Sequence, residues 1–431
     1  MKEKFIKSSI ILIIGGVITK LLGMLNKIVM TRLLTEEGVG IYMLIVPTFS
    51  LFVNIASFGF PVAVSKMIAE NNKKSIKLLS STIVASLFIN ILLIIIIILV
   101  APFLSHSLLK EDRCIYGILA ISFVIPFTSI SSIIRSYFFG KEKTFPHVLS
   151  NIIEDITRLL LIIIGIPIYI RKGLEYAVFY LIASNVLCEI VSIITLLLFV
   201  PKNKKITKND IKPSKTYLKD SLNISIPTTI NRLIGSITYF LEPIILTSCL
   251  LYTGFSNKYI ISEYGVLQAY VMPTLLLPSF FSMSISQALL PIISKNYSLK
   301  KYRYTKKKIK EACLLCFLLG LVFTIIFIIC PNIILNLLYN TNRGSLYMRF
   351  LAPIVLLQYI ISPIQTSLDA MGKSNENLII TIITSIIRTI LIPILSLFKI
   401  GIWTLIISIS INVIIGSLLS IKVINNSLKQ N

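Results

Sequence analysis

Acidic residues are scarce in this sequence: Asp and Glu number 18, against 42 Lys and Arg, in a chain of 431 residues. Histidine is rarer still, and its two residues, His106 and His147, lie in predicted loops on opposite sides of a membrane. No Gly-rich phosphate loop is present, and no outward loop carries the paired carboxylates that acid–base catalysis uses. These absences argue against nucleotide binding and against a membrane-embedded glycosyl- or acyltransferase.

The six cysteines do not form a metal-binding pattern. Most lie in apolar runs, where cysteine packs as a small hydrophobic residue. Cys313 and Cys316 have a C-x-x-C spacing inside an apolar helix, but no second pair lies nearby. We therefore expect neither a metal nor another cofactor.

Long apolar runs are what the sequence has in abundance: 55% of its residues are hydrophobic, and the mean hydropathy is +0.88. A bilayer core about 30 Å thick needs roughly 20 apolar residues per helix, and open strands would leave backbone groups unpaired in lipid. The first run lacks a short signal-peptide pattern with a cleavage site, so it should stay as a helix. The sequence predicts an all-α polytopic membrane protein.

We predict twelve transmembrane spans, divided six and six by a polar, Lys-rich segment at residues 201–220 that prolines interrupt. The predicted domains are an N-terminal lobe at 1–200, the basic linker at 201–220 and a C-terminal lobe at 221–431. The spans are at about residues 6–32, 39–65, 78–103, 115–138, 148–170, 176–200, 221–251, 264–293, 311–336, 347–369, 377–398 and 401–423.

The formal net charge of +24 comes mainly from short loops between the apolar spans. Placing the N-terminus in the cytoplasm puts about three times as many Lys and Arg on the cytoplasmic side as on the other, as the positive-inside rule requires. This distribution favours membrane topology over nucleic-acid binding. We expect a bacterial plasma-membrane protein with both termini in the cytoplasm.

The two predicted lobes resemble each other in sequence. Residues 7–23 align with 219–235 without a gap, which places Lys20 on Arg232. Later matches follow in the same order: Gly38 with Gly265, and Gly140 followed by Arg158 with Gly372 followed by Arg388. Copies separated by six helices have the same orientation, so this is a parallel repeat, in which substrates bind between the halves near the midplane.

Several cations lie deep inside apolar spans, where each costs on the order of 2.5–3.5 kcal/mol. Such residues are expected to face a wet cavity or a partner. Four lie near the midplane, and two more lie nearer a span end. The predicted cavity residues are Lys20, Arg158, Arg232 and Arg388, with Lys27 and Arg135.

Structural ion pairs are the alternative explanation for these cations. Glu154 precedes Arg158 by four residues, the favourable order for a helical pair, so Arg158 fits either role. Glu189 and Glu242 are candidates to neutralise other cations or to couple ions. Because intramembrane cations outnumber acids, we predict a cavity that favours anions.

Two segments resemble a known family. GGVITKLLGMLNKIVMTRLLTEEGVGIYMLIVPTFSLFVNIASFGFPVAVSKMIAEN, at residues 15–71, is similar to the opening of the stage V sporulation protein B family. That family belongs to the polysaccharide-transporter branch of the multidrug/oligosaccharidyl-lipid/polysaccharide exporter superfamily. The second segment, SSIIRSYFFGKEKTFPHVLSNIIEDITR, carries the family pattern at Arg135, Gly140, Ser150, Glu154 and Arg158.

The resemblance implies a two-lobed flippase for undecaprenyl-diphosphate-linked sugars, such as a peptidoglycan precursor for the spore cortex. Relatives that flip lipid II use a cationic central cavity, and many have fourteen helices where we count twelve. Cell-wall polymerases, as users of the exported unit, are candidate partners.

The runner-up function is a cation–drug antiporter, which would need intramembrane carboxylates. An assembly scaffold without transport leaves the repeated cations unexplained. The candidate carboxylates are Glu154, Asp155, Glu189 and Glu242.

Overall fold

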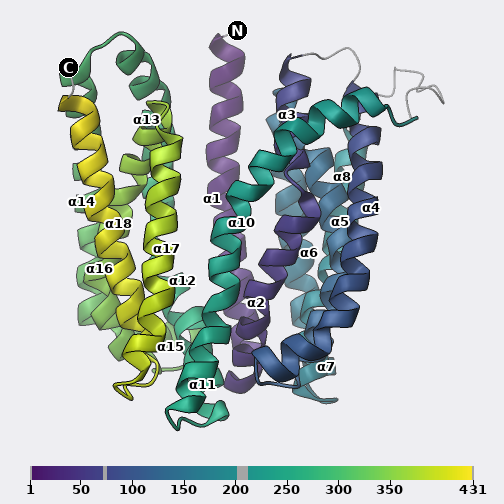
Figure 1. The fold of residues 1–431 in the computed structure, drawn as a ribbon, viewed down its shortest axis with the longest axis vertical. Coiled ribbons are helices and arrows are strands. Elements are labelled where there is room, and N and C mark those ends of the chain that lie inside the picture. Colours follow the sequence, from purple (N-terminus) through teal and green to yellow (C-terminus); the bar gives the residue numbers. More distant parts are fainter. Residues whose placement is uncertain (1, 71–74, 201–211, 430–431) are drawn as a thin grey trace. The chain divides into compact units, whose positions relative to one another are not determined.

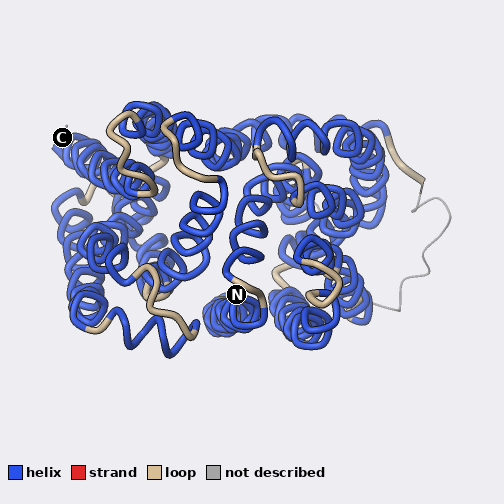
Figure 2. Tube along the Cα trace, turned by 90° about the horizontal axis from the view of Figure 1, so that it is seen from below, coloured by secondary structure: helices blue, strands red, loops and turns tan. Residues whose placement is uncertain are grey.

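The computed structural model describes residues 2–70, 75–200 and 212–429, and the regular elements of these ranges are all helical, with no strand (Figure 1, Figure 2). The predicted all-α fold is therefore confirmed. The chain forms two compact units, residues 1–243 and 244–431.

The first unit contains the helices up to the middle of α10. They are α1 (Lys2–Leu33), α2 (Glu36–Ser57), α3 (Phe60–Glu70), α4 (Ser75–Pro102), the π-helical turn η2 (Phe103–Leu108), α5 (Cys114–Gly140), α6 (Thr144–Tyr169), α7 (Leu174–Ala183), α8 (Asn185–Leu198) and α10 (Lys215–Tyr252).

The second unit begins inside α10 and continues to the C-terminal helix. Its elements are α11 (Asn257–Gly265), the π-helical segment η3 (Val266–Val271), α12 (Met272–Leu276), α13 (Ser279–Ser298), α14 (Tyr302–Ile329), α15 (Pro331–Tyr339), α16 (Ser345–Ala370), α17 (Ser374–Ser396) and α18 (Trp403–Lys429).

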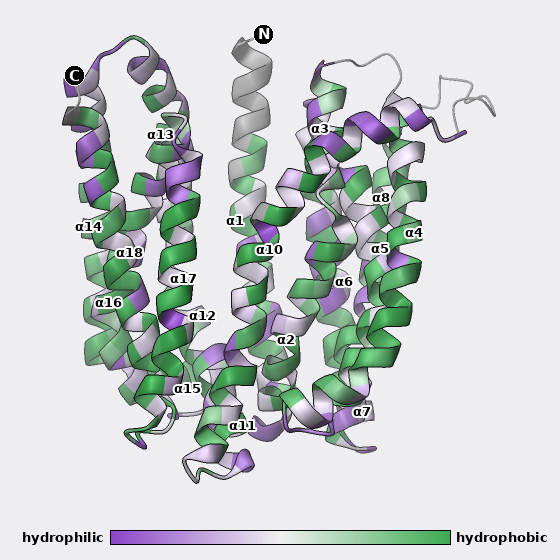
Figure 3. Ribbon diagram, in the orientation of Figure 1, coloured by the Kyte–Doolittle hydropathy of each residue, from purple (hydrophilic) through white to green (hydrophobic). Residues whose placement is uncertain are grey.

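Each of the twelve predicted spans falls on one helix or on a bent or broken helix pair. Within the described ranges, ten helices are long and apolar enough to cross a membrane, and the pair Asn257–Leu276 and Ser279–Ser298, bent by 49°, makes an eleventh. The remaining predicted span, 148–170, falls on α6, which is not among these helices and carries Glu154, Asp155 and Arg158 near its middle. Hydrophobic residues extend along the helices and hydrophilic ones gather at their ends (Figure 3).

The boundary between the two compact units lies at Pro243, within α10, rather than in the predicted linker. The first part of α10 belongs to the first unit because Tyr217 and Leu222 pack against a core built by α3, α4, α5 and α8. Residues 201–211 of the predicted linker lie outside the described residues, so the division into lobes at 1–200 and 221–431 stays a prediction.

The break between α2 and α3 brings the chain close to α10. Phe58 and Gly59 both have positive φ, 45° and 61°, and a Cβ at Gly59 would lie 2.6 Å from the carbonyl oxygen of Ser225. Only glycine fits there. α10 is itself bent (Figure 1), and it contains Pro227 and Pro243, each of which removes a helical hydrogen bond.

One salt bridge recurs in both units, which supports the internal repeat. Arg113, in the loop before α5, pairs with Glu37 at the start of α2, at 3.0 Å. Arg343, in the loop before α16, pairs with Glu263 on α11 at 2.5 Å, and Tyr347 donates to the same carboxylate. Each bridge ties the second passage of its half to the fourth.

Candidate functional site

A network of charged side chains lies where α5, α6 and α8 meet. Arg135 of α5 donates to Glu154 of α6, and also to Glu189 and Ser192 of α8, at 3.2 and 2.7 Å. Arg135 lies five residues before the end of α5 and Glu154 ten residues after the start of α6. The long arginine side chain spans this difference in position along the two helices. The two carboxylate side chains are each only 10% exposed.

Arg158 extends the network along α6. Its guanidinium donates to Glu154 at 2.7 Å, to Asp155 at 2.8 Å and to Asn185 of α8 at 3.2 Å. The predicted pair of Glu154 with Arg158 is therefore present, and Glu154 bridges both arginines. α1 also joins α6 here, because the Asn26 amide donates to the backbone carbonyl of Asp155.

The network contains three carboxylates and two guanidinium groups, so acids outnumber cations by one. Removing charges from water costs several kcal/mol per ion, and close pairing with further hydrogen bonds offsets that cost. Glu154 accepts from both arginines, while Ser192 and Asn185 accept further guanidinium hydrogens. The predicted surplus of cations over acids does not hold within this group of side chains.

A cavity of about 660 Å³ lies beside the network, entirely within the first unit. Arg135, Arg158 and Glu189 form part of its wall, and Arg232 contributes from α10. The position of Arg232 is linked to α2, because Asn54 donates to Ser236, which donates to the Arg232 carbonyl. The remaining wall is polar, aromatic and aliphatic: Asn54, Ser57, Ser65, Thr128, Ser132, Ser136, His147, Asn185, Phe49, Phe139, Val53, Pro61 and Val62.

Arg232 differs from the other two arginines of the cavity. Its side chain is exposed and forms no hydrogen bond or ion pair with any residue that the structure describes. Arg135 and Arg158 are both held by carboxylates. Arg232 is thus the cation whose donors are available to a ligand.

The other predicted cations lie elsewhere. Lys20, exposed, and Lys27, half-buried, are both on α1 and are not among the described residues that line this cavity. Arg388 is half-buried on α17 in the second unit. Glu242 is buried on α10.

Sequence reasoning did not predict the partners of Arg135, or the contacts of Asn185 and Ser192 with the arginines. Glu189 was a candidate to neutralise a cation, but its partner could not be assigned. These contacts join helices that are distant in sequence, so no local spacing indicates them. A polar residue within an otherwise apolar span is the signal that marks Asn185.

The fold resembles that of solved transporters described as members of the multidrug/oligosaccharidyl-lipid/polysaccharide (MOP) superfamily. A solved structure described as the inward-facing conformation of a multidrug resistance MATE family transporter of the MOP superfamily has a TM-score of 0.77. It is 17% identical, with 96% of each chain covered. A second, a MOP superfamily transporter from Pyrococcus furiosus Vc1, has a TM-score of 0.62 at 17% identity and covers all of this chain and 97% of its own.

Sequence comparison then shows the family. The model described as polysaccharide biosynthesis protein matches residues 5–297, and the MatE model matches 243–394. Stage V sporulation protein B of Bacillus subtilis (strain 168) is 32% identical, over 92% of this chain and 78% of its own length. Lipid II flippase MurJ of the same organism is 21% identical, over 93% of this chain and 79% of its own length. The chain belongs to the polysaccharide biosynthesis protein family. It is a membrane transporter rather than an enzyme, and the predicted resemblance is confirmed.

Proposed function

We propose that the protein flips a lipid-linked anionic saccharide, an undecaprenyl-diphosphate-linked unit, from the inner to the outer leaflet. The observation that carries this proposal is the cavity of the first unit, where the exposed Arg232 faces a wall rich in hydroxyl and amide groups. The names of the relatives, stage V sporulation protein B and lipid II flippase MurJ, support a role in cell-wall or spore-cortex synthesis.

Arg232 suits a diphosphate because guanidinium can bind two phosphate oxygens at once. Lys20, its counterpart in the repeat, is likewise exposed and forms no hydrogen bond or ion pair with the described residues. We assign these two residues to the phosphate groups, and the role of Arg388, which lies in the second unit, stays a prediction. Arg135 and Arg158 then hold the wall in place, because carboxylates of α6 and α8 already pair with them.

The rest of the wall suits a sugar. Asn54, Ser65 and Ser132 offer hydrogen-bonding groups for sugar hydroxyls, and Phe49 and Phe139 offer apolar surface for the faces of sugar rings. A binding site of a few polar groups within an apolar wall fixes the orientation of such a ligand.

Alternating access would carry the headgroup across while the prenyl tail stays in lipid. In parallel-repeat transporters one half rocks against the other around the substrate. An inside-negative potential favours outward movement of an anion by about 2.3 kcal/mol per charge per 100 mV. We place the protein in the bacterial plasma membrane with both termini in the cytoplasm, and cell-wall polymerases as users of the exported unit.

A cation-coupled drug antiporter is the second candidate. The excess carboxylate in the network of Arg135, Arg158, Glu154, Asp155 and Glu189 favours it, because such a group can bind a proton or another cation. The MatE model match at 243–394 also fits this function.

A leaflet-exposure assay for undecaprenyl-linked precursors in vesicles separates the two functions. Arg232→Ala should lower outward exposure about tenfold or more, and Arg232→Lys should retain part of it, since Lys keeps the charge without the bidentate geometry. Lys20→Ala should act in the same direction. Unchanged exposure in the alanine variants, together with cation–drug efflux that depends on the protein, would favour the antiporter.

A further inference from the structure

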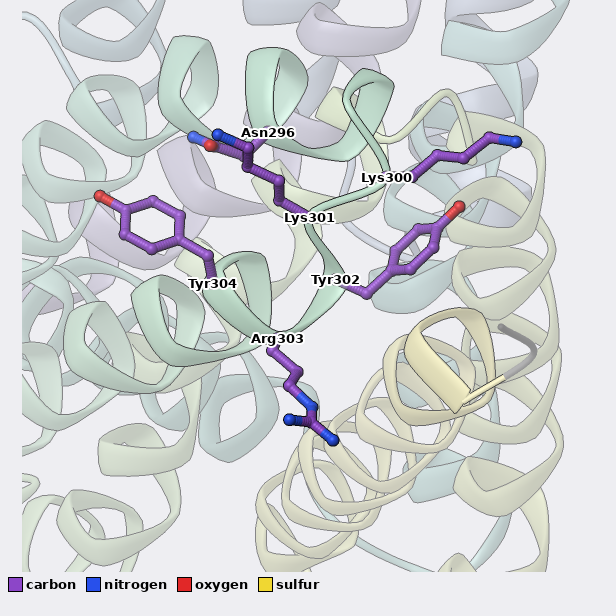
Figure 4. Close-up of a pocket in the computed structure, with 6 residues that line it drawn as sticks. All are labelled: Asn296, Lys300, Lys301, Tyr302, Arg303 and Tyr304. Carbon is purple, nitrogen blue, oxygen red and sulfur yellow. The ribbon is translucent and has the colours of Figure 1, made fainter.

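A second cavity, of about 670 Å³, lies at the turn between α13 and α14, wholly within the second unit. Three cations, two tyrosines and one amide line it (Figure 4). They are Asn296, Lys300, Lys301, Tyr302, Arg303 and Tyr304. None of them belongs to the transport cavity described above.

The charge around this turn is strongly one-sided. Residues 295–311 contain seven Lys, one Arg and a single acid, Glu311. Glu311 is already paired with Lys308 at 2.7 Å. The side chains of Lys300, Lys301 and Arg303 are exposed and form no ion pair with any described residue. The cavity therefore offers cationic groups without a protein counterion.

Local contacts connect the two ends of the turn. The amides of Lys300 and Lys301 donate to the carbonyls of Tyr297 and Asn296, both at 2.9 Å. The Tyr297 ring packs edge-on against Tyr302, with centroids 5.5 Å apart, and also against the core shared by α13, α14, α16 and α18. These contacts connect the backbone that presents the cations to the core of the second unit.

The positive-inside rule alone accounts for Lys and Arg near this end of the helices, but it does not require that they line a cavity. Figure 4 shows Lys301 and Tyr304 on one side of the turn, with Lys300 and Tyr302 on the other. Tyrosine prefers the membrane–water interface. Further along α14, Leu314, Leu315 and Leu318 are more than 50% exposed, an apolar surface suited to acyl chains.

We propose that this cavity binds the phosphate headgroup of an anionic phospholipid from the leaflet that the positive-inside rule assigns to the cytoplasm. Basic pockets between transmembrane helices on that side suit such headgroups. Lys300, Lys301 and Arg303 neutralise the phosphodiester, the tyrosines lie at headgroup level, and the exposed leucines of α14 contact the chains. This site is independent of the proposed transport activity.

Native mass spectrometry of the full chain, delipidated and titrated with phosphatidylglycerol or phosphatidylcholine, tests the proposal. The pocket variant is Lys300→Gln, Lys301→Gln and Arg303→Gln together. The matched control is Lys306→Gln, Lys307→Gln and Lys310→Gln, which removes the same charge from exposed positions outside the cavity. Gel filtration and thermal unfolding confirm that both variants are folded.

We expect phosphatidylglycerol to bind in preference to phosphatidylcholine, and the pocket variant to lose about tenfold or more in affinity while the control loses about twofold at most. Equal losses in the two variants would indicate a diffuse surface potential and overturn the site. Competition by millimolar inorganic phosphate or glycerol phosphate as effective as the lipid would assign a soluble phosphate instead. Binding of undecaprenyl diphosphate with no binding of phosphatidylglycerol would make the turn a substrate contact and also refute the proposal.

Discussion

The two repeated halves carry a central arginine at matching positions but surround it with different chemistry. Glu154 and Asp155 lie one turn before Arg158 on α6. The residues at the matching positions before Arg388 on α17 are Thr384 and Ser385. Arg135, five residues before Gly140, has Ser367 as its counterpart before Gly372. The last helix of each half supplies an asparagine: Asn185 accepts from Arg158, and Asn412 donates to the Thr384 carbonyl.

This difference shows that the repeat preserves helix order and the arginine, while the residues around the arginine have diverged. In the first unit, carboxylates from two helices hold both arginines. On α17, hydroxyl groups replace the carboxylates of that helix. Four experiments test this contrast between the halves.

The largest effect is expected from Glu154→Gln, because Glu154 bridges both arginines of the network. Breaking a buried pair costs about 3–5 kcal/mol. Thr384→Val at the matching position of α17 should cost only about 1 kcal/mol, the net value of an ordinary hydrogen bond. Unfolding in detergent, monitored by circular dichroism, measures both. Similar losses of stability in the two variants would show that the residue four positions before the arginine contributes equally in the two halves.

The glycine pair Gly140 and Gly372 gives the next largest difference. A Cβ at Gly140 would lie 2.6 Å from the carbonyl oxygen of Ser65 on α3, so alanine should cost about 2 kcal/mol through displaced helices. Gly372 has φ of 76° with open space around it, so alanine should cost about 1 kcal/mol in backbone strain. Thermal unfolding of the two alanine variants tests this ranking of stability losses. A greater loss of stability in Gly372→Ala than in Gly140→Ala would contradict it.

The third experiment adds to α17 the carboxylate that α6 has at the matching position. Thr384→Glu would place an acid four residues before Arg388, a spacing that supports an ion pair. If Arg388 contacts the anionic substrate, transport should fall about tenfold, equivalent to about 1.4 kcal/mol. Thr384→Gln has nearly the same size without the charge and serves as the control. Equal transport by the two variants would remove Arg388 from the substrate site.

The smallest effect concerns the recurring salt bridges. The coupling of Arg113 to Glu37 should be only about 0.2–1 kcal/mol, because both side chains are about one third exposed. Arg113→Gln by itself would also break the pair of Arg113 with the buried Glu111. The coupling of Arg343 to Glu263 should be larger, since Glu263 is only 13% exposed and also accepts from Tyr347. A double-mutant cycle with Glu37→Gln and Glu263→Gln measures each coupling. A larger coupling at Arg113 would contradict this ranking.

Much of this architecture is readable from the sequence. Apolar runs of bilayer length predict the twelve passages, and each of them coincides with a helix or helix pair. The pair of Glu154 with Arg158 is also predictable, since residues four apart on a helix are neighbours. In both cases the decisive interactions are local or repeat along one helix.

Other features required the packed structure. Arg135 and Glu154 lie at different heights on α5 and α6, and Glu189 lies on a third helix, so only the rotation and approach of these helices bring them together. The first part of α10 packs against the first unit because of the close approach of Ser225 to Gly59. Spacing within a segment therefore specifies the helices, their repeat and the presence of buried charge. Packing between helices selects which arginines are held by carboxylates and which one is open to a ligand, because partners on separate helices meet only after the helices pack.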